Sequence, residues 1–182
     1  GRRWLLSAVA RVMQPGAKVD NCIILEGAQG LGKSTAIKGL CGPDWFCDDV
    51  EDLSDKDTKL KLRGKWIIEL GELSALSRGE VNQTKAFMSR ASDTYRAPYG
   101  RTATDYPRQC VFFGTTNHDV YLRDETGNRR FWPLRCNPVV EHMLDLAGIE
   151  RDRDQIWAEA YLLYCDGQPW HMADISLIRE AQ

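Results

Sequence analysis

The chain has 182 residues, of which 43% are hydrophobic and 27% charged, and a net charge of −2. These values are ordinary for a folded globular protein and exclude a fibrous, low-complexity or wholly disordered chain. The slightly acidic total charge also excludes attraction of nucleic acid by the whole molecule, so a nucleic-acid partner would need a local basic patch.

Hydrophobic spacing and turn residues predict alternating helices and strands. In chain order we expect a helix at 3–14, a strand at 19–26, a helix at 34–40, a short strand at 45–46, a helix at 54–63, a strand at 64–70, a helix at 77–92, a hairpin or extended loop at 93–107, a strand at 110–114 and a helix at 154–164. Strands separated by helices favour the α/β class, with a mainly parallel sheet flanked by helices.

The domain organisation follows from the same pattern. We expect a single domain over residues 1–182, made of the N-terminal helix, a core at about 19–135 and a helical tail at about 140–182. The chain lacks an initial Met and opens directly into a helical pattern, which predicts that it was cut from a longer protein. No run of about 18 apolar residues is present, and the six cysteines form no C-x-x-C pair, so we expect no membrane segment and a reducing cytoplasm.

The most informative segment joins the second and third predicted elements. It matches the pattern G-x-x-x-x-G-K-[ST] and reads Gly27, Ala28, Gln29, Gly30, Leu31, Gly32, Lys33, Ser34. The small residues allow backbone N–H groups to wrap phosphates at the start of a helix. Lys33 is expected to reach the β- and γ-phosphates and Ser34 to ligate Mg²⁺. The segment, extended to Thr35, therefore predicts a site for ATP and Mg²⁺.

Two carboxylates mark the end of the apolar strand at 64–70. Glu69 lies within this strand and Glu72 lies just past its end. One of them could hold the Mg²⁺ neighbourhood and the other could polarise the attacking water. We favour Glu69 for the metal and Glu72 for the water, but the spacing leaves this division open, and a surface-exposed pair is the alternative.

Polar residues after the later strands complete the predicted site. Asn117 is a candidate sensor that would hydrogen-bond the γ-phosphate or the attacking water, although Asn also follows strands for turn geometry alone. Arg129 and Arg130 are candidates for an arginine finger, which neighbouring subunits commonly supply. The alternative is an Arg pair that bridges surface carboxylates such as Asp124 and Glu125.

A basic and aromatic section separates the acids from Asn117. Cationic side chains alternating with aromatic rings suit a single strand of nucleic acid, because phosphates need charge and bases need stacking faces. The contacts are expected at Lys85, Arg90, Arg96, Tyr99 and Arg101. The alternative is a solvated hairpin whose tyrosines pack locally.

Together these motifs resemble the virulence-associated protein E family, a phage- and prophage-borne branch of superfamily 3 helicases within the AAA+ P-loop ATPases. The resemblance covers about residues 4–170 and is carried by the segments 25–34, 66–73, 96–101, 114–117 and 126–133. It implies a P-loop ATPase sheet that assembles into hexameric rings and moves along single-stranded DNA in the cytoplasm of a bacterial host. Full-length relatives often carry a primase-like or DNA-binding region upstream.

The resemblance also implies roles for individual residues. Lys33 and Ser34 would serve as Walker A residues, Asn117 as the sensor, and the 85–101 segment as the DNA-facing hairpin. Glu69 or Glu72 would be the Walker B acid, and Arg129 or Arg130 the finger in trans. One departure is that the two acids are three positions apart, where the usual Walker B strand has an adjacent acidic pair.

Two other classes of function remain open. A P-loop phosphotransferase acting on a small molecule would use the arginines as a lid within one chain. A non-motor ATP-dependent switch would use a ring only as an interaction platform. A finger in trans makes hydrolysis depend on assembly and concentration, whereas a lid in cis does not.

Overall fold

The computed structural model describes residues 1–50, 53, 55–71, 78–117, 128–136 and 144–171. Within these residues, five parallel strands form one sheet in the order β2-β3-β6-β1-β7. The strands are β1 (Cys22–Glu26), β2 (Phe46–Cys47), β3 (Ile67–Leu70), β6 (Val111–Thr116) and β7 (Phe131–Arg135). The predicted α/β class with a mainly parallel, helix-flanked sheet is confirmed.

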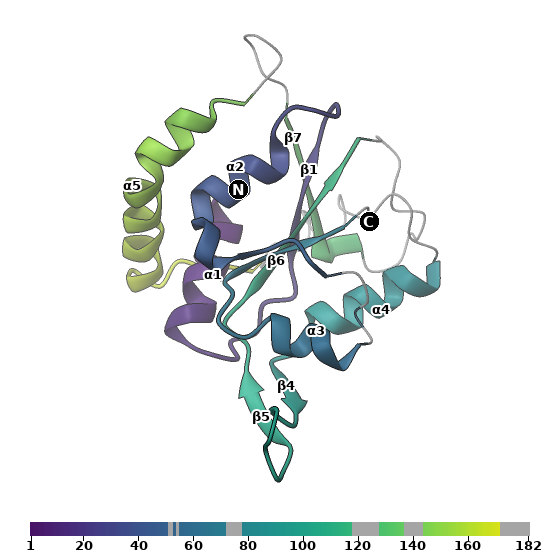
Figure 1. The fold of residues 1–182 in the computed structure, drawn as a ribbon. Helices are drawn as coiled ribbons and strands as arrows, with labels where there is room; N and C mark the ends of the chain where they lie inside the picture. Colours follow the sequence, from purple (N-terminus) through teal and green to yellow (C-terminus); the bar gives the residue numbers. More distant parts are fainter. Residues whose placement is uncertain (51–52, 54, 72–77, 118–127, 137–143, 172–182) are drawn as a thin grey trace.

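Helices cover both faces of this sheet (Figure 1). One face carries α1 (Arg2–Met13), α2 (Lys33–Cys41) and α5 (Leu146–Cys165), and the other carries α3 (Lys56–Lys61) and α4 (Arg78–Met88). Side chains of β1 alternate between the two layers, since Ile23 packs with Trp4 and Ile37 whereas Ile24 packs with Phe87. Because both faces are covered, this strand is apolar without alternation.

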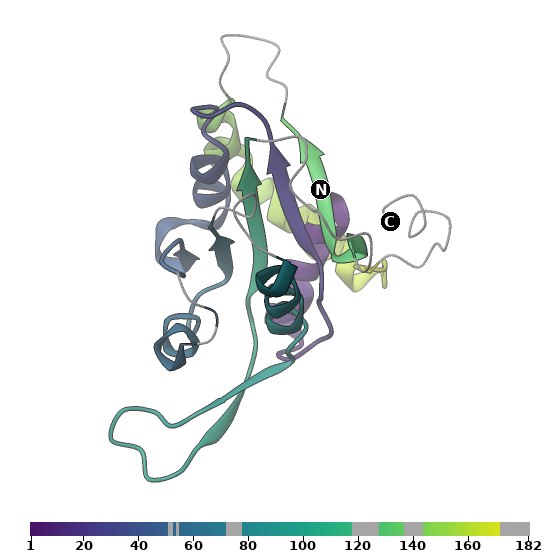
Figure 2. The same cartoon turned by 90° about the vertical axis from the view of Figure 1, so that its right-hand side faces the viewer.

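An antiparallel hairpin of β4 (Ser92–Tyr95) and β5 (Thr104–Pro107) projects away from the sheet (Figures 1 and 2). Its base is held by Arg108, whose guanidinium donates to both carboxylate oxygens of Asp93 at 2.5 and 2.7 Å. A third nitrogen-to-oxygen contact joins Arg108 to the carbonyl of Phe87 in α4 at 2.5 Å. The pair is almost fully buried, so it fixes where the hairpin leaves the body of the protein.

Replacing Asp93 with Asn should lower the free energy of unfolding by about 3–5 kcal/mol, because the buried Arg108 charge loses its counter-ion. Urea unfolding measures the change. The matched control is Asp49→Asn, which breaks the exposed pair with Lys61 and should cost at most about 1 kcal/mol. Equal losses in the two variants would mean that the buried pair does not anchor the hairpin.

Two elements differ from the sequence prediction. Helix α5 begins at Leu146 rather than at 154, because the Asp145 side chain caps it by accepting from the Gly148 backbone N–H at 2.8 Å. Strand β7 was not predicted, and it contains Pro133, a residue that disfavours strands. Proline is tolerated there because β7 is the last strand in the described sheet order and has a free edge.

The other predicted elements are found with ends shifted by a few residues. Helix α4 stops at Met88, earlier than predicted, because β4 begins at Ser92. The short 3₁₀ turns at Pro43–Trp45 and Asn128–Arg130 lead directly into β2 and β7. None of the helices in the described ranges combines the length and the apolar character needed to cross a bilayer.

Candidate nucleotide-binding site

The predicted site residues gather where the central strands end. Since β3, β6 and β1 are parallel and adjacent, their last residues Leu70, Thr116 and Glu26 lie at the same edge of the sheet. The loop at 27–32 leaves this edge and leads into α2. Ligands of open α/β sheets bind outside the carboxyl ends of the strands, so this edge is the expected place for a nucleotide.

The glycines of the loop are needed for its backbone path. Gly32 and Gly30 have φ angles of 79° and 83°, which side-chain-bearing residues rarely adopt. A Cβ added at Gly27 would approach the Cys136 carbonyl and a methyl of Leu31 to 2.8 Å. The loop is therefore tight, and it leads into α2, whose first backbone N–H groups have no partner within the helix and can bind phosphate oxygens.

Lys33 is the first residue of α2, and its side chain turns back over the loop. Its ammonium Nζ donates to the carbonyls of Gly27 at 2.7 Å and Ala28 at 2.8 Å, and to Asn117 Oδ1 at 3.0 Å. The residue is buried, and burial lowers the pKa of its amine. A cation held beside the N-terminus of a helix fits the phosphate chain of a nucleotide.

Ser34 and Glu69 meet directly beside Lys33. Ser34 Oγ donates to Glu69 Oε1 at 2.6 Å, and Thr115 Oγ1 approaches the same oxygen at 3.4 Å. Burial raises the pKa of the Glu69 carboxyl, and the two hydroxyl contacts partly oppose this shift. A serine hydroxyl beside a carboxylate at the end of a strand is a donor set suited to Mg²⁺.

The structure thus brings together Lys33, Ser34, Glu69 and Asn117. Glu72 lies outside the described residues, so the division of labour between the two acids stays a prediction. Thr115 was not singled out in the sequence. It was missed because its contact with Glu69 depends on the register in which β3 and β6 pair, which no local motif reports.

Arg129 and Arg130 do not join this cluster. They precede β7, and Phe131 at the start of β7 pairs with Cys22 at the start of β1. The length of β1, about 13 Å at 3.3 Å per residue, separates them from the edge of the sheet that carries the loop at 27–32, which we call the P-loop edge. Arg130 lies 3.7 Å from the Asp20 carboxylate and 3.3 Å from Ser89 Oγ. Arg129 is exposed and forms no ion pair with other described residues.

The predicted nucleic-acid residues divide into two groups. Arg96, Tyr99 and Arg101 are in the loop that joins β4 to β5; Tyr99 is fully exposed, and both arginines are exposed. Arg90 is exposed at the end of α4, with its guanidinium 5.4 Å from the Phe87 ring. Lys85 is buried, so it does not share the exposed surface of the other four.

The burial of Lys85 follows from helical spacing. It comes four residues after Val81 and three before Met88, and both of these side chains pack into the core under α4. Positions at this spacing share one face of a helix. The prediction of Lys85 as a DNA contact therefore relied on its charge and missed the direction of its helix face.

Comparison with known proteins identifies the family. The family model of the virulence-associated protein E-like domain matches residues 1–182. The chain belongs to this family. No curated protein matches the chain at a significant level.

Two solved structures share the fold. The chain resembles the A-form apo structure of the NrS-1 C-terminal region, with a TM-score of 0.58, 18% identity and coverage of 86% of this chain and 40% of that one. An A-form apo structure of the same region spanning 305–718 gives a TM-score of 0.56 at 18% identity, covering 85% of this chain and 38% of that one. The virulence-associated protein E-like domain therefore spans about two fifths of these relatives.

Proposed function

We propose that this virulence-associated protein E-like domain is the ATPase module of a DNA helicase or translocase of phage or prophage replication. ATP would be hydrolysed at interfaces between protomers of a ring, of which the hexamer implied by the family is the expected form. The proposal is supported most by one observation: Lys33, Ser34, Glu69 and Asn117 share one edge of the sheet, whereas Arg129 and Arg130 lie at the opposite edge.

This placement supports a site completed by a neighbour. In a ring, one protomer would present its P-loop edge and the next would present its Arg pair across the interface. A guanidinium there would stabilise the charge that develops on the transferred phosphoryl group. A phosphotransferase lid in cis is less favoured, because the same chain keeps these arginines the length of β1 away from Lys33.

The residues at the P-loop edge have separable roles in the proposal. The loop N–H groups and Lys33 would bind and orient the phosphates, and Ser34 would ligate Mg²⁺ with Glu69 beside it. Bound Mg²⁺ would neutralise phosphate charge and align the triphosphate. Asn117 would position the attacking water, and Glu69 or Glu72 would polarise it.

The test is the rate of ATP hydrolysis against protein concentration, measured with and without single-stranded DNA. We expect the rate of hydrolysis per protomer to rise with protein concentration and to increase further when single-stranded DNA is added. A rate per protomer that does not change with concentration would contradict a shared site. A rate that rises with protein concentration but is the same with and without single-stranded DNA would instead favour the non-motor switch.

Arg96→Ala and Arg101→Ala should each lower the affinity for single-stranded DNA and reduce the slope of log affinity against log salt by about one. Both side chains are exposed in the hairpin loop, where phosphates can reach them. Fluorescence anisotropy of a labelled oligo(dT) at several salt concentrations measures both quantities. The control is Arg151→Ala, which removes an exposed arginine already paired with Asp152. If the salt slope were unchanged in the hairpin variants, the DNA contact would have to lie on another surface.

A further inference from the structure

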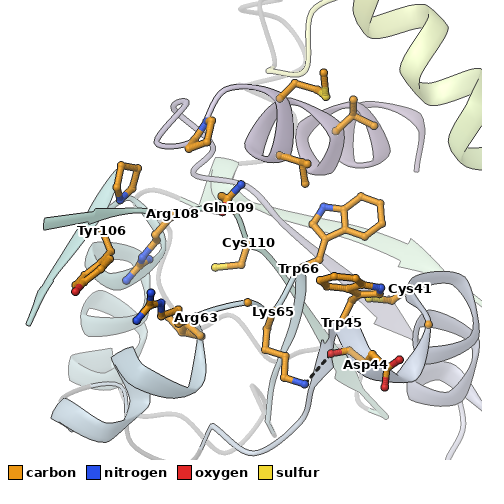
Figure 3. Close-up of a pocket in the computed structure, with 18 of the residues that line it drawn as sticks. Cys41, Asp44, Trp45, Arg63, Lys65, Trp66, Tyr106, Arg108, Gln109 and Cys110 are labelled. Atoms are coloured by element: carbon orange, nitrogen blue, oxygen red, sulfur yellow. Dashed lines mark hydrogen bonds between the residues drawn. The ribbon is translucent and has the colours of Figure 1, made fainter. Parts of the chain in front are cut away.

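A large cavity lies at the sheet edge opposite the P-loop (Figure 3). Its volume is about 960 Å³, within the range of ligand-binding pockets. Trp45, Trp66 and Cys110 line it, and each directly precedes a strand of the sheet: β2, β3 and β6. The cavity therefore lies where these strands begin and is separate from the nucleotide site, which lies where they end.

One side of the cavity is apolar and aromatic. The rings of Trp66 and Trp157 are 4.2 Å apart and form part of its wall. Large hydrophobic side chains are exposed around it, with Trp45 at 56%, Met13 at 49% and Tyr161 at 44%. Apolar surface collected in one concave place is typical of a binding site rather than of ordinary solvent-facing surface.

The other side of the cavity carries positive charge that is not paired with carboxylates of the described residues. Lys65 donates to the Asp44 carbonyl at 2.8 Å, and Lys59 donates to the Thr94 carbonyl at 3.3 Å. The guanidinium of Arg63 lies 5.1 Å from the centre of the Tyr106 ring. In the described ranges, none of these three cations forms an ion pair, so their charge is available to an anionic ligand.

The remaining charges that line the cavity nearly cancel. Arg108 is neutralised by Asp93, and Arg153 is paired with Asp154 at 3.1 Å. Asp44 contributes one carboxylate against the three cations Lys59, Arg63 and Lys65. The cavity is therefore locally basic in a chain whose total charge is −2.

This basic and aromatic wall is continuous with the hairpin. Tyr106 belongs to β5 and stacks on Tyr95 of β4 with ring centres 4.4 Å apart. Arg63 packs on the ring of Tyr106, and Lys59 donates a hydrogen bond to a main-chain carbonyl of β4. A single strand of DNA that contacts the hairpin loop would therefore meet these cations between the loop and the mouth of the cavity.

We propose that this cavity is a second contact for single-stranded DNA, in which unstacked bases lie against Tyr106 at one end of the cavity and against Trp45 at the other, with Arg63 and Lys65 between them (Figure 3). The flanking phosphates lie on Arg63 and Lys65. Planar faces beside cations suit nucleotides in a sequence-tolerant way. The single-stranded DNA reaches the cavity from the hairpin contact, so this inference rests on the proposed function.

The test uses the full chain and fluorescein-labelled oligo(dT), with affinity measured by anisotropy over a range of salt. Trp45→Leu should weaken binding about tenfold, whereas Trp45→Phe, which keeps a flat ring, should stay within about threefold of the unchanged chain. The double variant Arg63→Gln and Lys65→Gln should reduce the salt slope by about two. Lys61→Gln is the matched control on α3, since it is paired with Asp49 and does not line the cavity.

A second measurement locates the bases directly. Oligo(dT) containing 5-iodouracil, cross-linked by light and mapped by mass spectrometry, should label Trp45 or Tyr106. Labelling confined to the hairpin loop, or equal affinity in the Trp45→Leu variant, would overturn the inference while leaving the hairpin contact intact. A change in sedimentation without loss of DNA affinity would instead identify the cavity as a protein interface.

The outcomes also separate this inference from the proposed function. Loss of affinity in Arg96→Ala with none in the cavity variants rejects the cavity alone. A chain that hydrolyses ATP but binds no oligo(dT) rejects both DNA contacts and leaves the ATPase standing. ATP hydrolysis without DNA should be the same in the Trp45 variants as in the unchanged chain, because the cavity and the P-loop lie at opposite edges of the sheet.

Discussion

Replacing Lys33 with Ala should abolish ATP hydrolysis, with a fall in kcat of at least about a hundredfold. Its ammonium sits over the loop, held by the Gly27 and Ala28 carbonyls and by Asn117. Removing it takes away the charge that would balance the β- and γ-phosphates and would stabilise the transition state. Steady-state phosphate release measures the effect.

The fold should survive this change, because Lys33 lies at the loop rather than in either apolar core. Circular dichroism and the thermal midpoint check this. Lys38→Ala is the matched control, since it removes an exposed lysine from the outer part of the same helix. Hydrolysis at the normal rate by the Lys33→Ala protein would reject the P-loop as the catalytic site.

Replacing Arg129 with Ala should lower kcat by about 10³-fold or more, the range found for arginine fingers. The two arginines are not equivalent, because Arg130 is directed to Asp20 and Ser89 of its own chain, whereas Arg129 is exposed and forms no ion pair with the described part of the chain. We therefore expect the larger loss at Arg129 and a smaller loss, with some loss of stability, at Arg130. Nucleotide binding should be nearly unchanged in both variants.

Measurement of kcat and of nucleotide affinity in the two variants separates these roles. Arg151→Ala provides a control that removes the same charge from an exposed pair on α5. If Arg129→Ala weakened ATP binding by one isolated protomer, a lid in cis would replace the finger. If Arg130→Ala gave the larger fall in kcat, Arg130 would be the finger, and its guanidinium would have to separate from Asp20 to reach the neighbouring site.

The grouping of Lys33, Ser34, Glu69 and Asn117 at one edge could be predicted from the sequence because its parts are local. The loop pattern specifies the strand, turn and helix that surround Lys33, and a carboxylate and an amide at strand ends are brought together by any parallel sheet. The contact between Ser34 and Glu69 is one result of this rule. The rule does not set the register, so it gave no indication that Thr115 would contact Glu69.

The features that were missed depend on long-range packing. Pro133 disfavours a strand locally, yet β7 forms because it is the last strand in the described sheet order, where its outer side needs no donor for the ladder. The charge of Lys85 indicated exposure, whereas the packing of α4 buried it. The cavity beside Trp45 is lined by residues of α1, α5, the base of the hairpin and the segments that precede β2, β3 and β6. No single segment of the sequence therefore predicts it.

If each ATP site is shared by two protomers, two inactive variants should complement each other when they are mixed. A mixture of Lys33→Ala and Arg129→Ala proteins contains interfaces where an intact P-loop faces an intact finger. We expect ATP hydrolysis to return in the mixture, to be greatest at intermediate ratios and to be absent from either protein alone. No recovery at any ratio, with both variants still assembling with unchanged protein, would contradict it.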